Sequence, residues 1–162
     1  CVKLLEQAKE AVVYAPRQLA PFILTIYNRL GGGIKLLPPQ TAEGESQLRL
    51  DINSRLNYGK IVAMNAGADF PDAVSSMLRT CSRQRMELVE VWLSLADPGA
   101  GDAYETLKRL GFFFTGLLPG SSKGCYAIMQ NLMGEEPDFD RPVTRDDFTQ
   151  TLRELRKLYE QG

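Results

Sequence analysis

Three consecutive segments of this sequence carry a strand pattern before strands and helices begin to alternate, and this order restricts the folds open to the chain. Residues 34–37 are expected to form a short strand closed by Pro38-Pro39, residues 47–52 alternate polar and apolar side chains, and residues 61–64 are apolar throughout. Alternation indicates a strand with one wet face, whereas a continuous apolar run indicates a central strand. Three such strands in a row disfavour a plain doubly wound sheet.

Helix patterns occupy the segments between and after these strands. An apolar stripe with a helical period runs through residues 19–30, and Pro71 opens a second helix. The triplet Gly31-Gly32-Gly33 follows the first helix instead of opening one, so we interpret it as a helix terminator and not as a phosphate loop. The full expected order is strand 11–14, helix 19–30, strands 34–37, 47–52 and 61–64, helix 71–81, strand 86–95, helix 102–110, strands 112–118 and 125–132, and helix 144–160.

This order indicates an α/β (α+β) protein with one domain. The 162 residues are enough to bury a sizeable core, which we expect at residues 11–133, followed by the helix at 144–160. Residues 1–10 are expected to add a short helix. Because the chain opens on Cys1 and not on a methionine, we expect residues to be missing upstream, through processing or because the domain was excised from a longer protein.

The composition excludes several classes of function. Nineteen basic residues nearly balance twenty acidic ones, which argues against a nucleic-acid or anionic-membrane surface. The chain has no histidine, which removes Ser-His-Asp and Cys-His catalysis and histidine-based metal sites. No apolar run approaches the length of about twenty residues that spans a membrane.

The cysteines indicate a reducing compartment. Cys1, Cys81 and Cys125 are an odd number at unrelated spacings, which fits neither a disulfide framework nor a zinc site. We therefore expect a cytoplasmic protein, with no metal ligands, in which Cys81 and Cys125 are small core residues.

Two further expectations concern local structure. Arg55, Asn57 and Gly59 should form or flank a reversing turn between two antiparallel strands, because alternating strand patterns lie on both sides of a polar segment. The last helix carries an apolar stripe for docking on its own sheet or on a second copy, in which case the chain is a homodimer. The stripe consists of Phe148, Leu152, Leu155 and Tyr159, and Thr144 should cap the helix with Asp147 at the third position.

The element order and the decapeptide at residues 103–112, Ala-Tyr-Glu-Thr-Leu-Lys-Arg-Leu-Gly-Phe, resemble the GNAT superfamily of N-acetyltransferases. The decapeptide is similar to the segment in which a helix of that family ends at Leu-Gly-Phe and enters the sixth strand. The resemblance implies a mixed, mostly antiparallel central sheet flanked by helices, to which this chain adds a C-terminal helix. It also implies acetyl-CoA or another acyl-CoA as cofactor.

The turn that would hold this cofactor departs from the family pattern. In the family, a basic, glycine-rich turn after the fourth strand opens a helix, and its N–H groups hold the pyrophosphate of coenzyme A. Here that turn has one glycine, no lysine or arginine, and Pro71, which donates no N–H. Asp69 and Asp72 should cap the helix and repel a pyrophosphate. We therefore expect no cofactor and no cofactor-binding residues. If an acyl-CoA binds after all, the contacts would come from Asn65, Ala66, Gly67, Ala68 and Asp69.

The residues for acyl transfer are also missing, so no catalytic residue is expected. Many family members carry a tyrosine four residues before the glycine of the decapeptide, where this chain has Leu107. Tyr104 lies nearly one turn away and should pack against the sheet. Glu87 and Glu90 are the nearest candidates for a general base. Because they alternate with valines on a strand, solvent exposure at a sheet face is the expectation for both.

Two functions follow from these features. The first is a non-catalytic sensor or interaction module, a pseudoenzyme that binds a protein partner or an upstream domain of the same chain. The decapeptide, the turn at residues 67–69 and the strand at 86–95 are similar to a narrower group, bacterial regulatory proteins in which a GNAT-like domain follows an anti-sigma-factor-type ATPase domain. The alternative is an active N-acyltransferase with a divergent cofactor site, which moves an acyl group from coenzyme A to an amine.

Overall fold

A computed structural model describes residues 11–119, 125–139 and 146–160 of the chain. The helix expected at residues 1–10 and the cap expected at Thr144 lie outside the described residues. The described elements follow the expected order, with four helices and seven strands. They are β1 (Ala11–Tyr14), α1 (Ala20–Leu30), β2 (Ile34–Leu37), β3 (Gln47–Asn53), β4 (Tyr58–Asn65), α2 (Phe70–Arg83), β5 (Leu88–Ser94), α3 (Ala100–Arg109), β6 (Phe113–Leu118), β7 (Tyr126–Asn131) and α4 (Asp146–Glu160).

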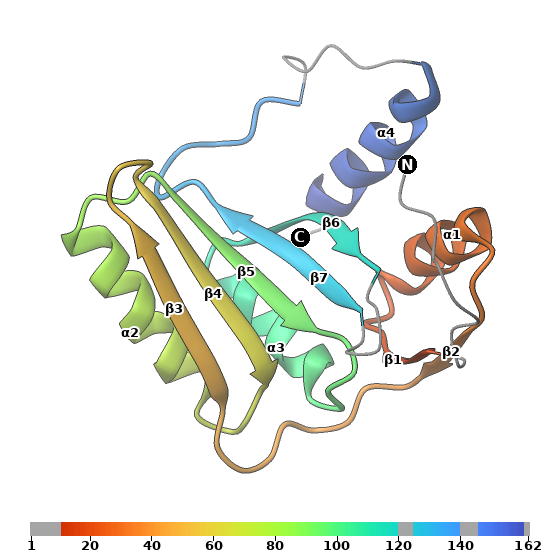
Figure 1. The fold of residues 1–162 in the computed structure, drawn as a ribbon, viewed down its shortest axis with the longest axis horizontal. Coiled ribbons are helices and arrows are strands. Elements are labelled where there is room, and N and C mark those ends of the chain that lie inside the picture. The colour runs from red at the N-terminus through yellow and green to blue at the C-terminus, as the bar shows by residue number, and fades with distance from the viewer. Residues whose placement is uncertain (1–10, 120–124, 140–145, 161–162) are drawn as a thin grey trace.

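Five strands form the central sheet, in the order β3-β4-β5-β7-β6 (Figure 1). The pairs β3-β4, β5-β7 and β6-β7 are antiparallel, and β4-β5 is parallel. β1 and β2 form a separate parallel pair. The expectation of a mixed, mostly antiparallel sheet flanked by helices, with an additional C-terminal helix, is confirmed.

The turn between β3 and β4 forms where the sequence predicts it. The two strands pair antiparallel up to Asn53 and Tyr58. Within the turn, the Arg55 amide donates to the Asn53 side chain at 3.1 Å, and Asn57 adopts a φ of 49°. Asparagine tolerates this left-handed conformation better than most residues. The prediction for this turn is confirmed.

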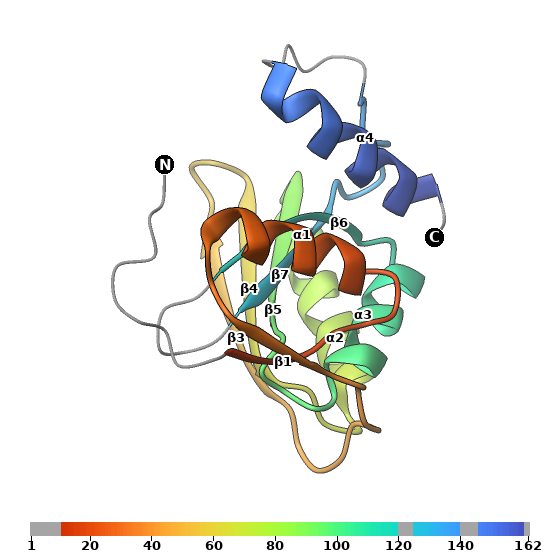
Figure 2. The same ribbon diagram turned by 90° about the vertical axis from the view of Figure 1, so that its right-hand side faces the viewer.

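α2 and α3 cover one face of the central sheet. Figures 1 and 2 show both helices on the same side of it. Alternate side chains of β5 point into this interface, and Val89, Val91 and Leu93 are almost completely buried. The residues between them, Glu90 and Trp92, lie on the opposite face, which α2 and α3 leave uncovered and which we call the open face.

The C-terminal helix docks on its own chain. Leu155 and Leu158 pack against the hydrophobic core, and the Tyr159 ring meets the Phe113 ring of β6 edge-on, with 5.6 Å between the centroids. Leu152 is half-buried, and the side chain of Phe148 lies outside the described residues. Leu155 therefore takes the expected docking role, with Leu158 beside it. Among the described helices, none combines the length and hydropathy needed to cross a membrane.

The expected strand at residues 86–95 is shorter in the structure. β5 begins at Leu88 and spans seven residues, whereas β4 spans eight and is the longest strand. Arg85, at a φ of 58°, reverses the chain after α2. The Glu87 amide then donates to the Asn57 carbonyl in the β3-β4 turn at 2.7 Å, so residues 86 and 87 serve as a connection and not as strand.

Cys81 and Cys125 are fully buried free thiols, as expected for small core residues. Burial raises the pKa of both thiols, that of Cys125 to about 11. Because the thiolate is the reactive form, both groups are protected by their pKa as well as by their burial.

We expect Cys81 and Cys125 to resist a water-soluble disulfide reagent at about pH 8 in the folded domain and to react at once after unfolding. The experiment uses the Cys1→Ser variant, so that only these two thiols are counted. The raised pKa of Cys125 also implies a loss of stability as the pH rises from about 9 towards about 11, because the unfolded thiol releases its proton first. Rapid labelling of the folded domain would contradict the buried placement.

Candidate functional site

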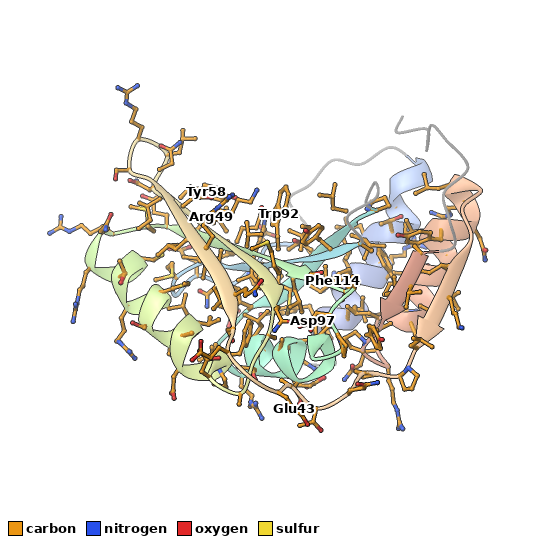
Figure 3. All side chains as sticks on the ribbon, turned by 60° about the horizontal axis from the view of Figure 1, so that its bottom comes forward. Glu43, Arg49, Tyr58, Trp92, Asp97 and Phe114 are labelled. Atoms are coloured by element: carbon orange, nitrogen blue, oxygen red, sulfur yellow. The ribbon has the colours of Figure 1, made fainter. Side chains whose placement is uncertain are left out.

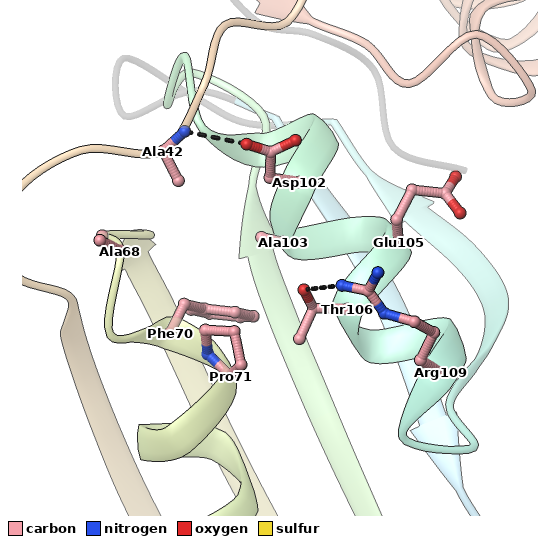
Figure 4. A pocket seen from close by; sticks show the side chains of 10 residues that line it. Ala42, Ala68, Phe70, Pro71, Asp102, Ala103, Glu105, Thr106 and Arg109 are labelled. Carbon is pink, nitrogen blue, oxygen red and sulfur yellow. Dashed lines mark hydrogen bonds between the residues drawn. The ribbon is translucent and has the colours of Figure 1, made fainter.

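A concave site lies between the β4-α2 turn and α3. It has a volume of about 470 Å³ (Figure 4). One wall carries Gly67, Ala68, Phe70 and Pro71, and the other carries Asp102, Ala103, Glu105, Thr106 and Arg109, with Ala42 between them. β4 and β5 run parallel and both end beside this cavity. The carboxyl ends of parallel strands are a common place for ligands in sheets of this kind.

The N–H groups of the β4-α2 turn are bonded within the chain. The Ala66 amide donates to the Asp97 carboxylate at 2.7 Å, the Gly67 amide to the Ser46 hydroxyl at 2.9 Å, and the Ala68 amide to the Gly44 carbonyl at 3.0 Å. These three amides belong to the segment in which the resemblance would place the pyrophosphate. Gly44, Ser46 and Asp97 therefore occupy three of the donors that a phosphate group would need.

Asp97 joins the ends of the two parallel strands. It follows β5, is buried, and accepts from the Ala66 amide after β4 as well as from the Gly99 amide at 3.3 Å. A buried carboxylate is costly unless it accepts hydrogen bonds, and these two backbone donors satisfy that need. The sequence marks Asp97-Pro98-Gly99 only as a strand breaker, so this role was not predicted.

The two aspartates of the turn do not cap α2, which corrects the expectation. Asp69 occupies the N-cap position without a side-chain cap bond, because its backbone is helical, with φ −84° and ψ −2°. Its carboxylate instead accepts from the Ser46 amide at 2.8 Å. Hydrogen bonds from the Ser46 side chain and then its amide hold the pKa of Asp69 below its ordinary value. Asp72 lies exposed in the first turn of α2, where Pro71 also lies, as expected.

Asp102 does not cap a helix either. α3 begins earlier, after Gly99, and no side chain caps it. The Asp102 carboxylate accepts from the Ala42 amide at 3.0 Å and so fixes residues 38–46 to α3 (Figure 4). On the same wall, Glu105 accepts from Gln18 at 3.0 Å, and Arg109 donates to the Thr106 hydroxyl at 3.0 Å. The cavity thus carries two carboxylates and one guanidinium group.

Tyr104 of the decapeptide is buried and is a poor candidate for the acid that protonates a leaving thiolate. Leu107 is completely buried and Tyr104 is 2% exposed, as expected for residues that pack against the sheet. Burial raises the pKa of the Tyr104 hydroxyl far above its ordinary value. A phenol with this pKa, packed in the core, is a poor proton donor to a ligand in the cavity.

The two candidate bases lie away from the cavity. Glu87 is exposed, as expected, and accepts from Asn57 at 2.9 Å. The expectation of solvent exposure is wrong for Glu90, which is half-buried on the open face and accepts from Tyr58 at 3.0 Å, from Gln130 at 2.9 Å and from the Trp92 indole. Three neighbouring strands contribute to this cluster, so no local pattern indicates it.

Lys60 completes the cluster around Glu90. Its ammonium group lies 3.1 Å from the centre of the Trp92 ring, a cation–π contact. Burial, and then the hydrogen bond to Glu90, raise the pKa of Tyr58 to about 12. The donors and the acceptor of this cluster satisfy one another. Within the described part of the chain, no group of three or more metal-ligating side chains is present.

Comparisons with protein-family models, with curated proteins and with solved structures give no match for this chain. Its fold and the geometry of the cavity are therefore the observations from which a function can be argued.

We expect Gly67→Ala to destabilise the domain by about 1–3 kcal/mol, as overpacking does. A Cβ at Gly67 would meet the backbone of Gly44 and Glu45 and lie 2.7 Å from the Ser46 nitrogen. Gly116→Ala is the matched control, because a Cβ there meets nothing within 4 Å. Urea unfolding of both variants measures the difference. Equal stabilities would show that residues 44–46 do not pack on the turn.

We expect Asp97→Ala to cost about 1–3 kcal/mol, because it leaves the Ala66 amide buried without an acceptor. Asp97→Asn should cost less, since one oxygen remains. Asp102→Ala is the control, because that carboxylate also accepts one backbone N–H but is exposed. Thermal unfolding and amide exchange at Ala66 report the effect. A loss for Asp102→Ala as large as that for Asp97→Ala would contradict the special role of Asp97.

Proposed function

We propose that this domain is a non-catalytic sensor or interaction module of a bacterial regulatory protein, related in its fold to the N-acetyltransferases and without acyl-CoA binding. One observation carries the proposal: the amides of Ala66, Gly67 and Ala68 are bonded to Asp97, Ser46 and Gly44. A pyrophosphate at this turn would have to displace a carboxylate, a hydroxyl and a carbonyl of the chain itself.

The charge at the turn also supports the proposal. Asp69 lies exposed at the start of α2, and the Asp97 carboxylate lies one hydrogen bond behind the turn. Pro71, in the first turn of the helix, donates no N–H. A helix start normally attracts anions through free N–H groups and its dipole. Here carboxylates oppose that attraction.

The positions of the candidate catalytic residues also support the proposal. Tyr104 is buried, and Leu107 stands at the position of the tyrosine that the family resemblance implies. Glu90 is held by three donors on the open face, away from α2 and α3. A module that lacks the family's tyrosine and free turn amides can still keep its sheet and helices as a surface for a protein partner or for an upstream domain.

An active N-acyltransferase is the second candidate, and the cavity favours it. The cavity of about 470 Å³ lies at the carboxyl ends of β4 and β5, with Arg109 on its wall. A guanidinium group binds phosphate well. An acyl-CoA bound there would use Arg109 on α3 in place of the turn amides.

We expect isothermal titration calorimetry of the purified domain with acetyl-CoA to show no binding, or a dissociation constant of about 1 mM or weaker. A dissociation constant below about 50 μM would overturn the proposal and favour acyl transfer.

If acetyl-CoA binds, substitutions in the domain show where it binds. Weaker binding by Arg109→Ala, with no change for the exposed Lys35→Ala, would place the ligand in the cavity between α2 and α3. A crystal with the pyrophosphate at residues 67–72 would instead place it at the turn and show that residues 44–46 can move aside.

A further inference from the structure

β3 is an edge strand of the central sheet. The structure pairs it with β4 on one side, and it lies at the end of the order β3-β4-β5-β7-β6 (Figure 1). Every second residue of such a strand presents its backbone N–H and C=O away from the sheet. Another extended strand can pair with this edge.

The usual protections of an exposed edge are weak in β3. Natural edges are blunted by proline, by bulges, by short length or by charges that repel a second strand. β3 has seven residues, Gln-Leu-Arg-Leu-Asp-Ile-Asn, without proline or glycine. Its register shifts only at its start, between Gln47 and Leu48. It carries one positive and one negative charge, Arg49 and Asp51, which cancel.

The side chains of β3 are complementary to those of β3 in a second, antiparallel copy. If two copies pair antiparallel with Leu50 opposite Leu50, then Arg49 of each copy lies opposite Asp51 of the other. Leu48 then lies opposite Ile52, and Gln47 opposite Asn53. Charged residues meet opposite charges, apolar residues meet apolar residues, and amides meet amides. Such cross-strand pairs are the unit of sheet stabilisation.

Neighbouring registers lack this match. A shift of two residues in one direction places Arg49 opposite Arg49, and a shift of two in the other direction places Asp51 opposite Asp51. Like charges directly opposite each other destabilise a pair of strands. A shift of one residue places Arg49 and Asp51 opposite apolar residues and brings the helix-covered face of one sheet beside the open face of the other.

We propose that β3 pairs antiparallel with β3 of a second copy of this chain, about a two-fold axis at Leu50. The two central sheets then form one continuous sheet of ten strands, five from each copy. An antiparallel pairing of this kind is isologous and closes after two copies. The axis runs perpendicular to the sheet, so α2 of both copies lies on the same face.

The charged side chains of Arg49 and Asp51 are exposed, so a second copy can reach them. The Arg49 and Asp51 side chains are 68% and 53% exposed and contact each other along the strand, with 3.0 Å between nitrogen and oxygen. Figure 3 shows Arg49 on the face turned away from α2 and α3. In the dimer, the two arginines and two aspartates would form one network of four alternating charges.

Outside the paired residues, the exposed side chains of Arg55, after β3, and Glu45, before β3, carry opposite charges. The pairing uses neither the cavity nor the β4-α2 turn, so it does not depend on whether an acyl-CoA binds.

The test is sedimentation equilibrium of the full chain over a range of concentrations up to roughly 1 mM. We expect a reversible monomer–dimer equilibrium. Arg49→Asp and Asp51→Arg should each weaken dimerisation about tenfold or more, because each substitution creates two like-charge pairs. Both side chains are exposed, so circular dichroism and thermal unfolding should show an unchanged fold.

Exchange of the charges makes the test specific. The double variant Arg49→Asp/Asp51→Arg restores opposite charges and should dimerise like the original chain. A mixture of the two single variants should form a heterodimer more tightly than either variant forms a homodimer, since every Arg then meets an Asp.

Each result decides the proposal. A chain that stays monomeric throughout, or a dimer that tolerates both single substitutions, would overturn it. Failure of the mixture to associate would exclude the register centred on Leu50, even if the single variants weaken the dimer.

Discussion

The parallel pairing of β4 with β5 is the constraint on which the rest of this structure depends. Parallel neighbours cannot be joined by a tight turn, so the chain must cross over the sheet, and α2 is that crossover. The crossover brings the ends of both strands to one edge, where Asp97 after β5 accepts from the Ala66 amide after β4. The cavity and the closed β4-α2 turn both follow from this one junction in an otherwise antiparallel sheet.

Sequence periodicity was sufficient for the elements but not for the bonds that connect them. Leu48, Leu50 and Ile52 identify β3 and its covered face, because alternation is a local property of the chain. The acceptors of the turn are not local: Asp97 lies 31 residues from Ala66, and Asp102 lies 60 residues from Ala42. A side chain that finds a distant amide in the fold cannot be distinguished in the sequence from one that caps the next helix, which explains the wrong expectation for Asp69 and Asp102.

The cavity and the turn beside it have opposite characters. In the turn, backbone amides and nearby carboxylates already form hydrogen bonds with groups of the same chain. The cavity is open and holds Asp102, Glu105 and Arg109 on one wall. The open face differs again, because the Glu90 cluster is polar and complete but lies on the uncovered side of the sheet.

Trp92 has a consequence for how this domain can be observed. It is the one tryptophan of the chain, and it lies on the open face with Lys60 over its ring and Glu90 bonded to its indole nitrogen. The tryptophan emission of the domain therefore comes from a fluorophore in a single, charged environment. A molecule that settles on this face, or a movement of β4 against β5, changes that environment directly, whereas events in the cavity on the far side of the sheet reach it only through the strands. The domain thus contains an optical probe that distinguishes its two faces without any label.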